Sequence, residues 1–279
     1  MAKKLIPMAI CYDFDGTLSP GNMQEYGFMN ALNQKSATDF WKESNGLACQ
    51  KQADTIAAYM WLMLNKLAEK KIAPIRKAFQ FYGSDVELYA GVEQWFNRIN
   101  AYARKKGVCL KHYIISSGLK EMIEGTKIAK NFKAIFASSF MYDENGEAFW
   151  PAMILNYTSK TQFIFRINKG CEDLTDNTTV NQFISDDKRA VPFANMIYVG
   201  DGETDVPCMK MVKLQGGHSV AVYRNGKKGL AKVHHLIKDN RVNTCVPADY
   251  RAGKPLEKYI QSVIDKVSAD YVVKNQEIN

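Results

Sequence analysis

The residues best suited to chemistry in this sequence are acids, hydroxyls and a lysine that follow short apolar runs. Asp13 and Asp15 come directly after residues 8–12, an apolar run typical of a buried strand. Open α/β sheets bind their ligands at the carboxyl ends of strands, and Gly16 indicates where the backbone turns. Taken alone, the same stretch also fits an Asp-Gly turn after a strand. The rest of the chain has to decide between a site and a simple turn.

Two further apolar runs end in a similar way. Residues 112–115 lead into Ser116, Ser117 and Gly118, and residues 196–199 lead into Gly-Asp-Gly-Glu-Thr-Asp at 200–205. Between them, Lys160 falls in the first turn of a helix expected to end at Gly170. A cation there interacts unfavourably with the helix dipole, which costs a few tenths of a kcal/mol to about 1 kcal/mol of helix stability. We therefore expect Lys160 to meet an anion, with Lys169 as the alternative for this role.

Three strand ends of this kind predict a charged ligand. Asp13, Asp201 and Asp205 could share one sheet edge only with a cation, because two unit charges about 4 Å apart repel by about 4 kcal/mol at an effective dielectric of about 20. Oxygen ligands without His or Cys favour Mg²⁺ over Zn²⁺. The hydroxyls and amides of residues 116–118, with Lys160, suit a tetrahedral oxyanion. A magnesium-bound phosphate is the expected occupant.

The order of elements predicts an α/β fold, a Rossmann-like doubly wound parallel sheet with an inserted helical cap and a small β-hairpin. About a hundred residues separate the first two strand ends, far more than the two to six of an ordinary α/β loop. We therefore assign residues 1–20 and 90–279 to the core and residues 21–89 to the cap. Residues 119–130 are expected to form a helix, 134–137 a strand, and 140–150 a hairpin that turns at Asn145-Gly146.

Composition narrows the functional classes. The chain has 279 residues, 46% of them hydrophobic, which is enough for a full core. Its six cysteines form no Cys-x-x-Cys pair, which argues against a zinc site and favours reduced core thiols. The net charge of +8 comes with only short basic clusters, which favours solvated helix surface over a nucleic-acid footprint. We expect a cytoplasmic protein without a membrane span, acting on a small phosphorylated metabolite; the oligomeric state is not readable.

The chain resembles the haloacid dehalogenase (HAD) superfamily, and in layout its phosphoserine-phosphatase-like branch. Asp-Phe-Asp-Gly-Thr at 13–17 resembles the first family motif, Ser116 the second, Lys160 the third, and residues 200–205 the fourth, in the family's order. The four motifs together are specific, although each one alone is weak.

The resemblance implies the roles of the site residues. Asp13 attacks phosphorus to form an aspartyl-phosphate, and Asp15, positioned by Thr17, protonates the leaving alcohol and then activates water. Mg²⁺ is implied on the Asp13 carboxylate, the Asp15 backbone carbonyl and Asp201, whereas Asp205 binds it directly, through water, or orients Lys160 instead. A halide needs no proton, and dehalogenases of the superfamily lack the second aspartate, so Asp15 favours a phosphatase.

The cap is implied to close over the substrate and to read its leaving group. In phosphoserine phosphatases an acid soon after the first motif and a cap arginine grip the amino acid. Glu25 and Arg76 are the candidates here, although Glu25 falls later than that pattern requires, and helix-surface charges are the alternative.

The predicted function is a Mg²⁺-dependent phosphomonoesterase. The alternatives are a phosphotransferase or phosphomutase, a nucleic-acid-end phosphatase or binder, and a non-catalytic binding protein.

Overall fold

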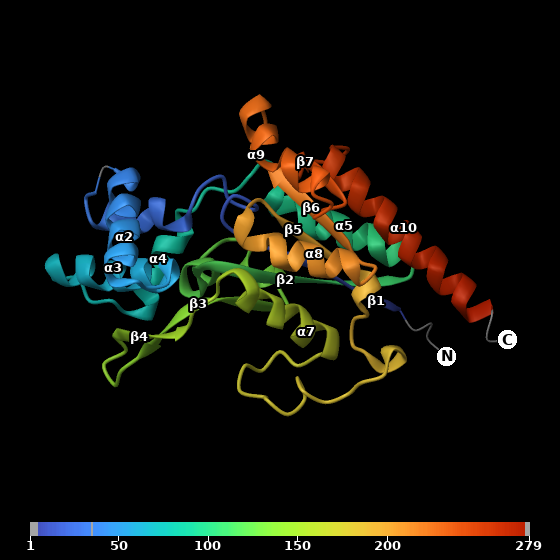
Figure 1. Ribbon diagram of the computed structural model, residues 1–279, viewed down its shortest axis with the longest axis horizontal. Coiled ribbons are helices and arrows are strands. Elements are labelled where there is room, and N and C mark those ends of the chain that lie inside the picture. Colours follow the sequence, from blue (N-terminus) through green and yellow to red (C-terminus); the bar gives the residue numbers. More distant parts are fainter. Residues whose placement is uncertain (1–4, 35, 277–279) are drawn as a thin grey trace.

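The computed structural model describes residues 5–34 and 36–276, which fold around one sheet (Figure 1). The strand order is β4-β3-β2-β1-β5-β6-β7, and neighbouring strands are parallel except for the antiparallel pair β3 and β4. The strands are β1 (Ile6–Tyr12), β2 (Val108–Leu119), β3 (Ala134–Tyr142), β4 (Ala148–Met153), β5 (Met196–Gly200), β6 (His218–Tyr223) and β7 (Thr244–Pro247). The predicted α/β class and largely parallel sheet are confirmed.

Strand β1 lies in the middle of the sheet and is buried on both faces, which explains its continuous apolar sequence. Met8, Ile10 and Tyr12 belong to one core cluster, and Ala9 and Cys11 to the other, because alternate side chains of a strand point to opposite faces. The first cluster includes residues of α5 (Val92–Lys105) and α10 (Pro255–Gln276). The second includes residues of α7 (Thr161–Lys169), α8 (Val206–Leu214) and α9 (Lys227–Lys238). The sheet is therefore covered on both faces.

A helical segment lies between β1 and α5 in the chain and at one end of the molecule in Figure 1. It contains α1 (Gly27–Ala31), α2 (Ala37–Lys51), α3 (Thr55–Glu69) and α4 (Arg76–Ser84). Asp54 caps α3 by accepting the backbone N–H groups of Ile56 and Ala57, at 2.8 and 3.2 Å. These N–H groups have no partner inside the helix, so the cap stabilises its start.

The helix that follows β2 is shorter than predicted. The prediction covers residues 119–130, whereas α6 spans Lys120–Glu124. Gly125 then packs against α4 so closely that a Cβ on it would lie 1.8 Å from the carbonyl oxygen of Gln80. Tertiary packing thus determines the conformation here, where local sequence favours a longer helix.

The predicted hairpin is present, with one difference. The turn is held by the side chain of Asp143, whose Oδ1 accepts the N–H groups of Asn145 and Glu147, both at 2.9 Å, and Gly146 takes a φ of +77°. The two short apolar runs before the turn, however, belong to a single strand, β3. Residues 138–139 continue it because Ser138 is fully buried and its Oγ accepts the N–H of Leu155 at 3.0 Å.

Two further predictions concern the cysteines, expected as reduced core thiols, and the membrane, which no helix is expected to span. All six cysteines are free, and Cys11, Cys171 and Cys208 are buried, but Cys49 is exposed on α2, so core thiols describe only part of the set. Within residues 5–34 and 36–276, no helix combines the length and apolarity needed to cross a bilayer.

His112 of β2 is buried beside Tyr12 of β1, and hydrogen bonds hold its ring on both sides. The Trp95 indole donates to the Tyr12 hydroxyl at 2.9 Å, this hydroxyl lies 3.0 Å from Nδ1 of His112, and Nε2 of His112 lies 3.0 Å from the side-chain oxygen of Asn100. The chain of donors and acceptors is satisfied when His112 is neutral with its proton on Nε2. Burial lowers the pKa of His112 to about 3.

This arrangement predicts acid sensitivity. In the unfolded chain, His112 takes up a proton as the pH falls below about 6.5, whereas the folded protein resists protonation until about pH 3. Stability is therefore lost as the pH falls through this window. We expect wild type to lose about 2 kcal/mol more unfolding free energy than His112→Gln between pH 7 and pH 5. Urea denaturation of both proteins at both pH values measures this, and equal losses would contradict it.

Candidate active site

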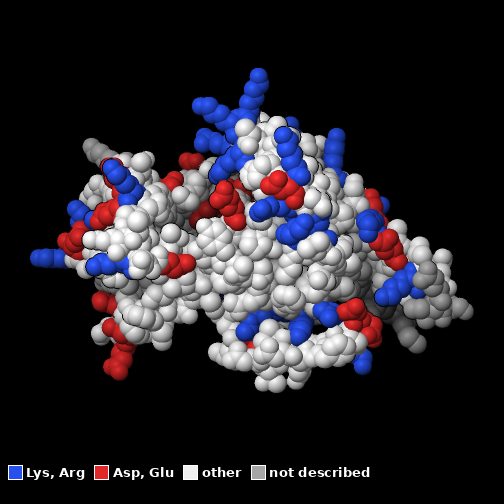
Figure 2. Space-filling view, in the orientation of Figure 1, with Lys and Arg blue, Asp and Glu red and all other residues white. Residues whose placement is uncertain are grey.

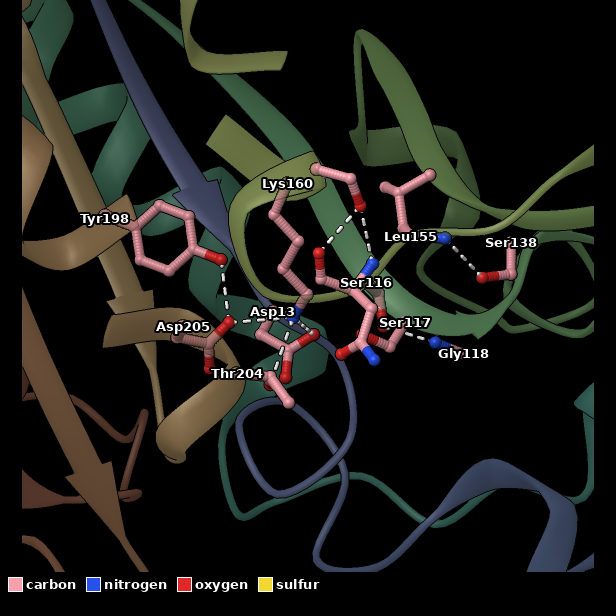
Figure 3. Close-up of polar contacts among 12 residues, drawn as sticks. Asp13, Ser116, Ser117, Gly118, Ser138, Leu155, Lys160, Tyr198, Thr204 and Asp205 are labelled. Atoms are coloured by element: carbon pink, nitrogen blue, oxygen red, sulfur yellow. Dashed lines mark hydrogen bonds and ion pairs between the residues drawn. The ribbon is translucent and has the colours of Figure 1, made fainter. Parts of the chain in front are cut away.

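The side chain of Lys160 lies between two carboxylates at the carboxyl edge of the sheet (Figure 3). Its Nζ is 3.2 Å from Oδ1 of Asp13 and 2.8 Å from Oδ1 of Asp205, and the lysine is fully buried. Asp13 directly follows β1, and its N–H donates to the carbonyl of Val199 in β5 at 2.9 Å. Burial alone would lower the pKa of Lys160, but the negative charges of Asp13 and Asp205 raise it above its usual value. The lysine is therefore a permanent cation.

Asp205 is held by a second donor that the sequence analysis did not identify. The hydroxyl of Tyr198 in β5 donates to Oδ1 of Asp205 at 2.8 Å (Figure 3), and Thr204 Oγ1 lies 3.5 Å from Nζ of Lys160. Tyr198 looks like an ordinary core residue of an apolar strand. The only available signal was a hydroxyl-bearing ring two residues before the end of that strand.

Three of the carboxylates form a group that fits a cation. One oxygen each from Asp13, Asp201 and Asp205 lie within 4.8 Å of one another, and Oδ2 of Asp205 is buried without a hydrogen-bond partner among the described residues. Burial and the charge of Asp205 raise the pKa of Asp13 to about 6, although Lys160 lowers it. Burial and the charges of Asp13 and Asp205 raise the pKa of Asp201 to about 7. A bound cation would relieve this repulsion, and the oxygen donors fit a hard ion.

Gly16 lets the first motif approach the fourth. Its φ is +71°, and a Cβ built on it would lie 2.1 Å from Oδ2 of Asp201. The turn after Asp15 therefore needs glycine for two reasons, the left-handed backbone and the contact with Asp201.

Asp15 lies beside the group of three acids and is held by the backbone. Its Oδ1 accepts the N–H of Met23 at 2.9 Å. The hydroxyl of Thr17, expected to position Asp15, is buried and has no hydrogen-bond partner among the described residues. Burial and the charge of Asp13 raise the pKa of Asp15 well above its usual value. A carboxyl group with this environment is suited to carry a proton at neutral pH.

The hydroxyl and glycine residues of β2 form a bulge. Ser116 pairs with Ala137 and Leu119 with Ser138 in β3, so Ser117 and Gly118 are two extra residues on β2. The N–H of Gly118 donates to Oγ of Ser116 at 3.1 Å, and Oγ of Ser117 is buried without a partner among the described residues. A Cβ on Gly118 would lie 3.0 Å from Oδ2 of Asp15. The bulge therefore lies against the first motif, with hydrogen-bonding groups to offer an oxyanion.

Two residues named from the sequence, Lys169 and Arg76, bind groups outside the group of acids. Lys169 donates to the carbonyls of Val180 and Gln182, at 2.7 and 2.6 Å, in the loop that follows α7. Arg76 lies 4.4 Å from the ring centre of Tyr142, and its Nη1 is 3.8 Å from Glu121 and 3.7 Å from Glu124. These contacts favour the alternative in which Arg76 is a structural charge.

Glu25 lies closer to the site than Arg76. It accepts the indole N–H of Trp41 at 2.8 Å and the side-chain amide of Asn22 at 2.7 Å, and its charge contributes to the raised pKa of Asp15. It therefore stands near the general acid candidate while its carboxylate is occupied by two donors.

One side of the site opens beside the fourth motif. A cavity of about 300 Å³ is lined there by residues from that motif, η3 (Tyr157–Lys160) and α9: Tyr157, Gly202, Glu203, Thr204, Lys232, His235 and Leu236. Lys232 lies 4.0 Å from Asp201 and is largely exposed. Figure 2 shows Lys and Arg side chains gathered over α9, so this margin of the site is positively charged. Positive potential of this kind attracts anionic ligands.

The fold and the site define an α/β protein whose sheet edge combines acidic residues, a buried lysine and a bulge of small polar residues. The sequence pattern of the haloacid dehalogenase-like hydrolases matches residues 10–210, and the chain belongs to this family. The predicted superfamily is thereby confirmed.

One relative and several solved structures are similar to this chain. An uncharacterized protein of Borreliella burgdorferi is 29% identical over 284 residues, covering 92% of this chain and 96% of the relative. A substrate-bound phosphoserine phosphatase has a TM-score of 0.55 at 12% identity, covering 92% of this chain and 98% of the other. A HAD-family hydrolase from Salmonella enterica serovar Typhi has a TM-score of 0.56 at 15% identity, covering 87% and 68%. The structure thus has the fold of the phosphoserine phosphatases of this superfamily.

The contact at Gly16 predicts a selective loss of metal binding. Gly16→Ala adds a methyl group at the position of the Asp201 carboxylate, whereas Gly146→Ala, at a similar φ of +77°, meets nothing within 4 Å. Both substitutions cost about 1–2 kcal/mol for the left-handed backbone. Mg²⁺ at 100 times its dissociation constant is expected to stabilise wild type and Gly146→Ala by about 2.7 kcal/mol, and Gly16→Ala far less. Thermal unfolding with and without Mg²⁺ measures this, and equal stabilisation of all three would refute it.

Proposed function

We propose that this protein is a Mg²⁺-dependent phosphatase that hydrolyses a small phosphomonoester through an aspartyl-phosphate on Asp13. The observation that carries the proposal is the fully buried Lys160, whose ammonium contacts Asp13 at 3.2 Å beside a group of acids that fits a cation. A carboxylate can attack a phosphate dianion only if nearby positive charge offsets their repulsion. Lys160 provides such a charge next to the attacking atom.

In the first step, an oxygen of Asp13 forms a bond to phosphorus while the bond from phosphorus to the leaving oxygen breaks. Asp15 donates its proton to that oxygen, so an alcohol leaves. The raised pKa of Asp15 supports this role, because burial and the charge of Asp13 favour the protonated carboxyl group. The bulge at Ser116, Ser117 and Gly118 offers hydroxyl donors to the phosphoryl oxygens: Oγ of Ser117 has no partner among the described residues, and Oγ of Ser116 is held by the Gly118 N–H.

In the second step, Asp15 accepts a proton from water, and the water oxygen attacks phosphorus. The bond between Asp13 and phosphorus breaks, and inorganic phosphate leaves. Bound Mg²⁺ would supply charge neutralisation to Asp13 and the phosphoryl group, held by Asp13, Asp201, Asp205 and the backbone carbonyl of Asp15. Asp205 has a double role in this proposal, because Oδ1 holds Lys160 while Oδ2 is free for the metal.

The helical segment at residues 21–89 is proposed as the cap that covers the substrate, with residues 1–20 and 90–279 as the core. Aspartyl-phosphate analogues and substrates have been bound to phosphoserine phosphatases of the same fold. The basic margin over α9 supports an anionic substrate, and the cavity of about 300 Å³ beside the fourth motif provides space next to the site. The leaving group itself is to be identified by a screen of phosphomonoesters.

Removing the proposed nucleophile tests the proposal directly. Asp13→Asn keeps the size of the side chain but cannot form the aspartyl-phosphate, so phosphate release is expected to fall by at least about 10³-fold. Release is measured over a panel of phosphomonoesters, with Mg²⁺ and with EDTA. Asp143→Asn, in the hairpin turn, is the matched control and should keep wild-type rates. Activity that persists in Asp13→Asn would overturn the nucleophile, and activity in EDTA would overturn the metal.

The double role of Asp15 predicts a dependence on the leaving group. With an alkyl phosphate, Asp15→Asn is expected to lower kcat by about 10²–10⁴-fold, because the alkoxide leaves unprotonated. With 4-nitrophenyl phosphate the first step needs no proton, so one nitrophenolate per active site should appear in a burst before the slow hydrolysis. Stopped-flow absorbance measures the burst. Equal losses for both substrates without a burst would argue against Asp15 as the proton shuttle.

A further inference from the structure

A hydrogen bond joins the helical segment to the bulge in β2. Tyr59 lies on α3, is 3% exposed, and donates its hydroxyl to the backbone carbonyl of Ser117 at 2.8 Å. Its ring packs edge-on against Trp41, with the ring centres 5.9 Å apart. Burial and the charge of Asp15 raise the pKa of Tyr59 well above its usual value, so the hydroxyl stays protonated and remains a donor.

The carbonyl that Tyr59 binds belongs to a peptide group that is held on both sides. The other end of this group is the N–H of Gly118, which donates to Oγ of Ser116 at 3.1 Å. The carbonyl of this peptide group is thus bound by a residue of the helical segment, and its N–H by a residue of the sheet. The plane cannot rotate without breaking at least one of the two bonds, each worth about 0.5–1.5 kcal/mol.

A second residue of the same segment holds the next peptide group. The N–H of Leu119 donates to Sδ of Met23 at 3.2 Å, although a thioether is a weak acceptor. A Cβ on Gly118 would lie 2.1 Å from Cε of Met23, so the methionine packs directly on the bulge. The backbone N–H of Met23 also binds Asp15 at 2.9 Å. The bulge and the acid are therefore both tied to the segment that follows the first motif.

We propose that Tyr59 is a positioning residue for phosphate binding: docking of α3 fixes the orientation of the 117–118 peptide group. The N–H of this group holds Oγ of Ser116, so the orientation sets where the hydroxyl donors of the bulge lie. This inference rests on the proposed function for the claim that the bulge binds the phosphoryl group. The oxyanion donors are then fully arranged only while α3 lies against the sheet. A substrate whose leaving group holds α3 away from the bulge would bind its phosphate more weakly.

Tyr59→Phe removes the hydroxyl and keeps the ring, which allows a direct test. In the free protein, we expect faster hydrogen exchange at the amides of Gly118 and Leu119, relative to amides of β5. With Mg²⁺ and a phosphomonoester, we expect the inhibition constant of inorganic phosphate and KM to rise together by about three- to tenfold, the loss of one hydrogen bond. Exchange is measured by NMR, and inhibition by steady-state kinetics.

Tyr102→Phe is the matched control, because its hydroxyl binds Asp265 at 2.9 and 3.0 Å, between α5 and α10. This variant should keep wild-type exchange at the bulge and wild-type phosphate inhibition. If Tyr59→Phe lowers the melting temperature but changes neither, the tyrosine is only structural and the inference is wrong. If wild type itself hydrolyses no phosphomonoester and binds no phosphate, the proposed function fails, and the exchange measurement alone decides whether Tyr59 holds the bulge.

Discussion

The organisation of the site depends on an imbalance of charge in a place that water barely reaches. Four acids, Asp13, Asp15, Asp201 and Asp205, lie close together, and burial and the neighbouring carboxylate charges raise the pKa values of the first three. Among the described residues one buried ammonium, that of Lys160, contacts Asp13 and Asp205. Removing charges from water is costly, and the raised pKa values of Asp13 and Asp201 express that cost. Protons or a cation must therefore compensate the acids. The oxygen donors of Asp13, Asp201 and Asp205 fit a hard metal ion in that role.

The fold produces this concentration of charge because parallel strands end together. Strands β1, β2 and β5 are neighbours, so the residues that follow β1 and β5 and the bulge near the end of β2 reach the same edge. Close approach then requires special residues at the turns. Glycine at position 16 makes room for Asp201, and glycine at position 200 makes room for Asp205, whose Oδ2 would lie 2.4 Å from a Cβ there. The buried apolar faces of β1 provide stability that offsets the cost of bringing like charges together at this edge.

The family and the chemistry are separate conclusions. Membership among the haloacid dehalogenase-like hydrolases follows from the match over residues 10–210, but a fold hosts different reactions. In the proposed mechanism Asp15 carries the distinction, since a proton donor beside Asp13 would serve an alcohol leaving group, whereas a halide needs no proton. The segment at residues 21–89 is tied directly to the site: the N–H of Met23 binds Asp15, and the hydroxyl of Tyr59 binds the carbonyl of Ser117 in the bulge.

The sequence by itself determined the sheet class, the carboxyl ends of β1 and β5, the hairpin and the order of the four motifs, because these depend on residue periodicity and on contacts within a few positions. It placed the ends of β2 and β3 too early, since these strands continue to Leu119 and Tyr142. Only the tertiary structure decided the remaining contacts. The hydroxyl of Tyr198 binds Asp205, and that of Tyr59 binds the carbonyl of Ser117. Arg76 forms an ion pair with Glu121. Helix α6 ends early because Gly125 packs closely on Gln80. Each joins segments distant in the chain or depends on the shape of a neighbouring helix. Local patterns contain no information about such partners, since the free energy that selects them arises from packing after the chain has folded.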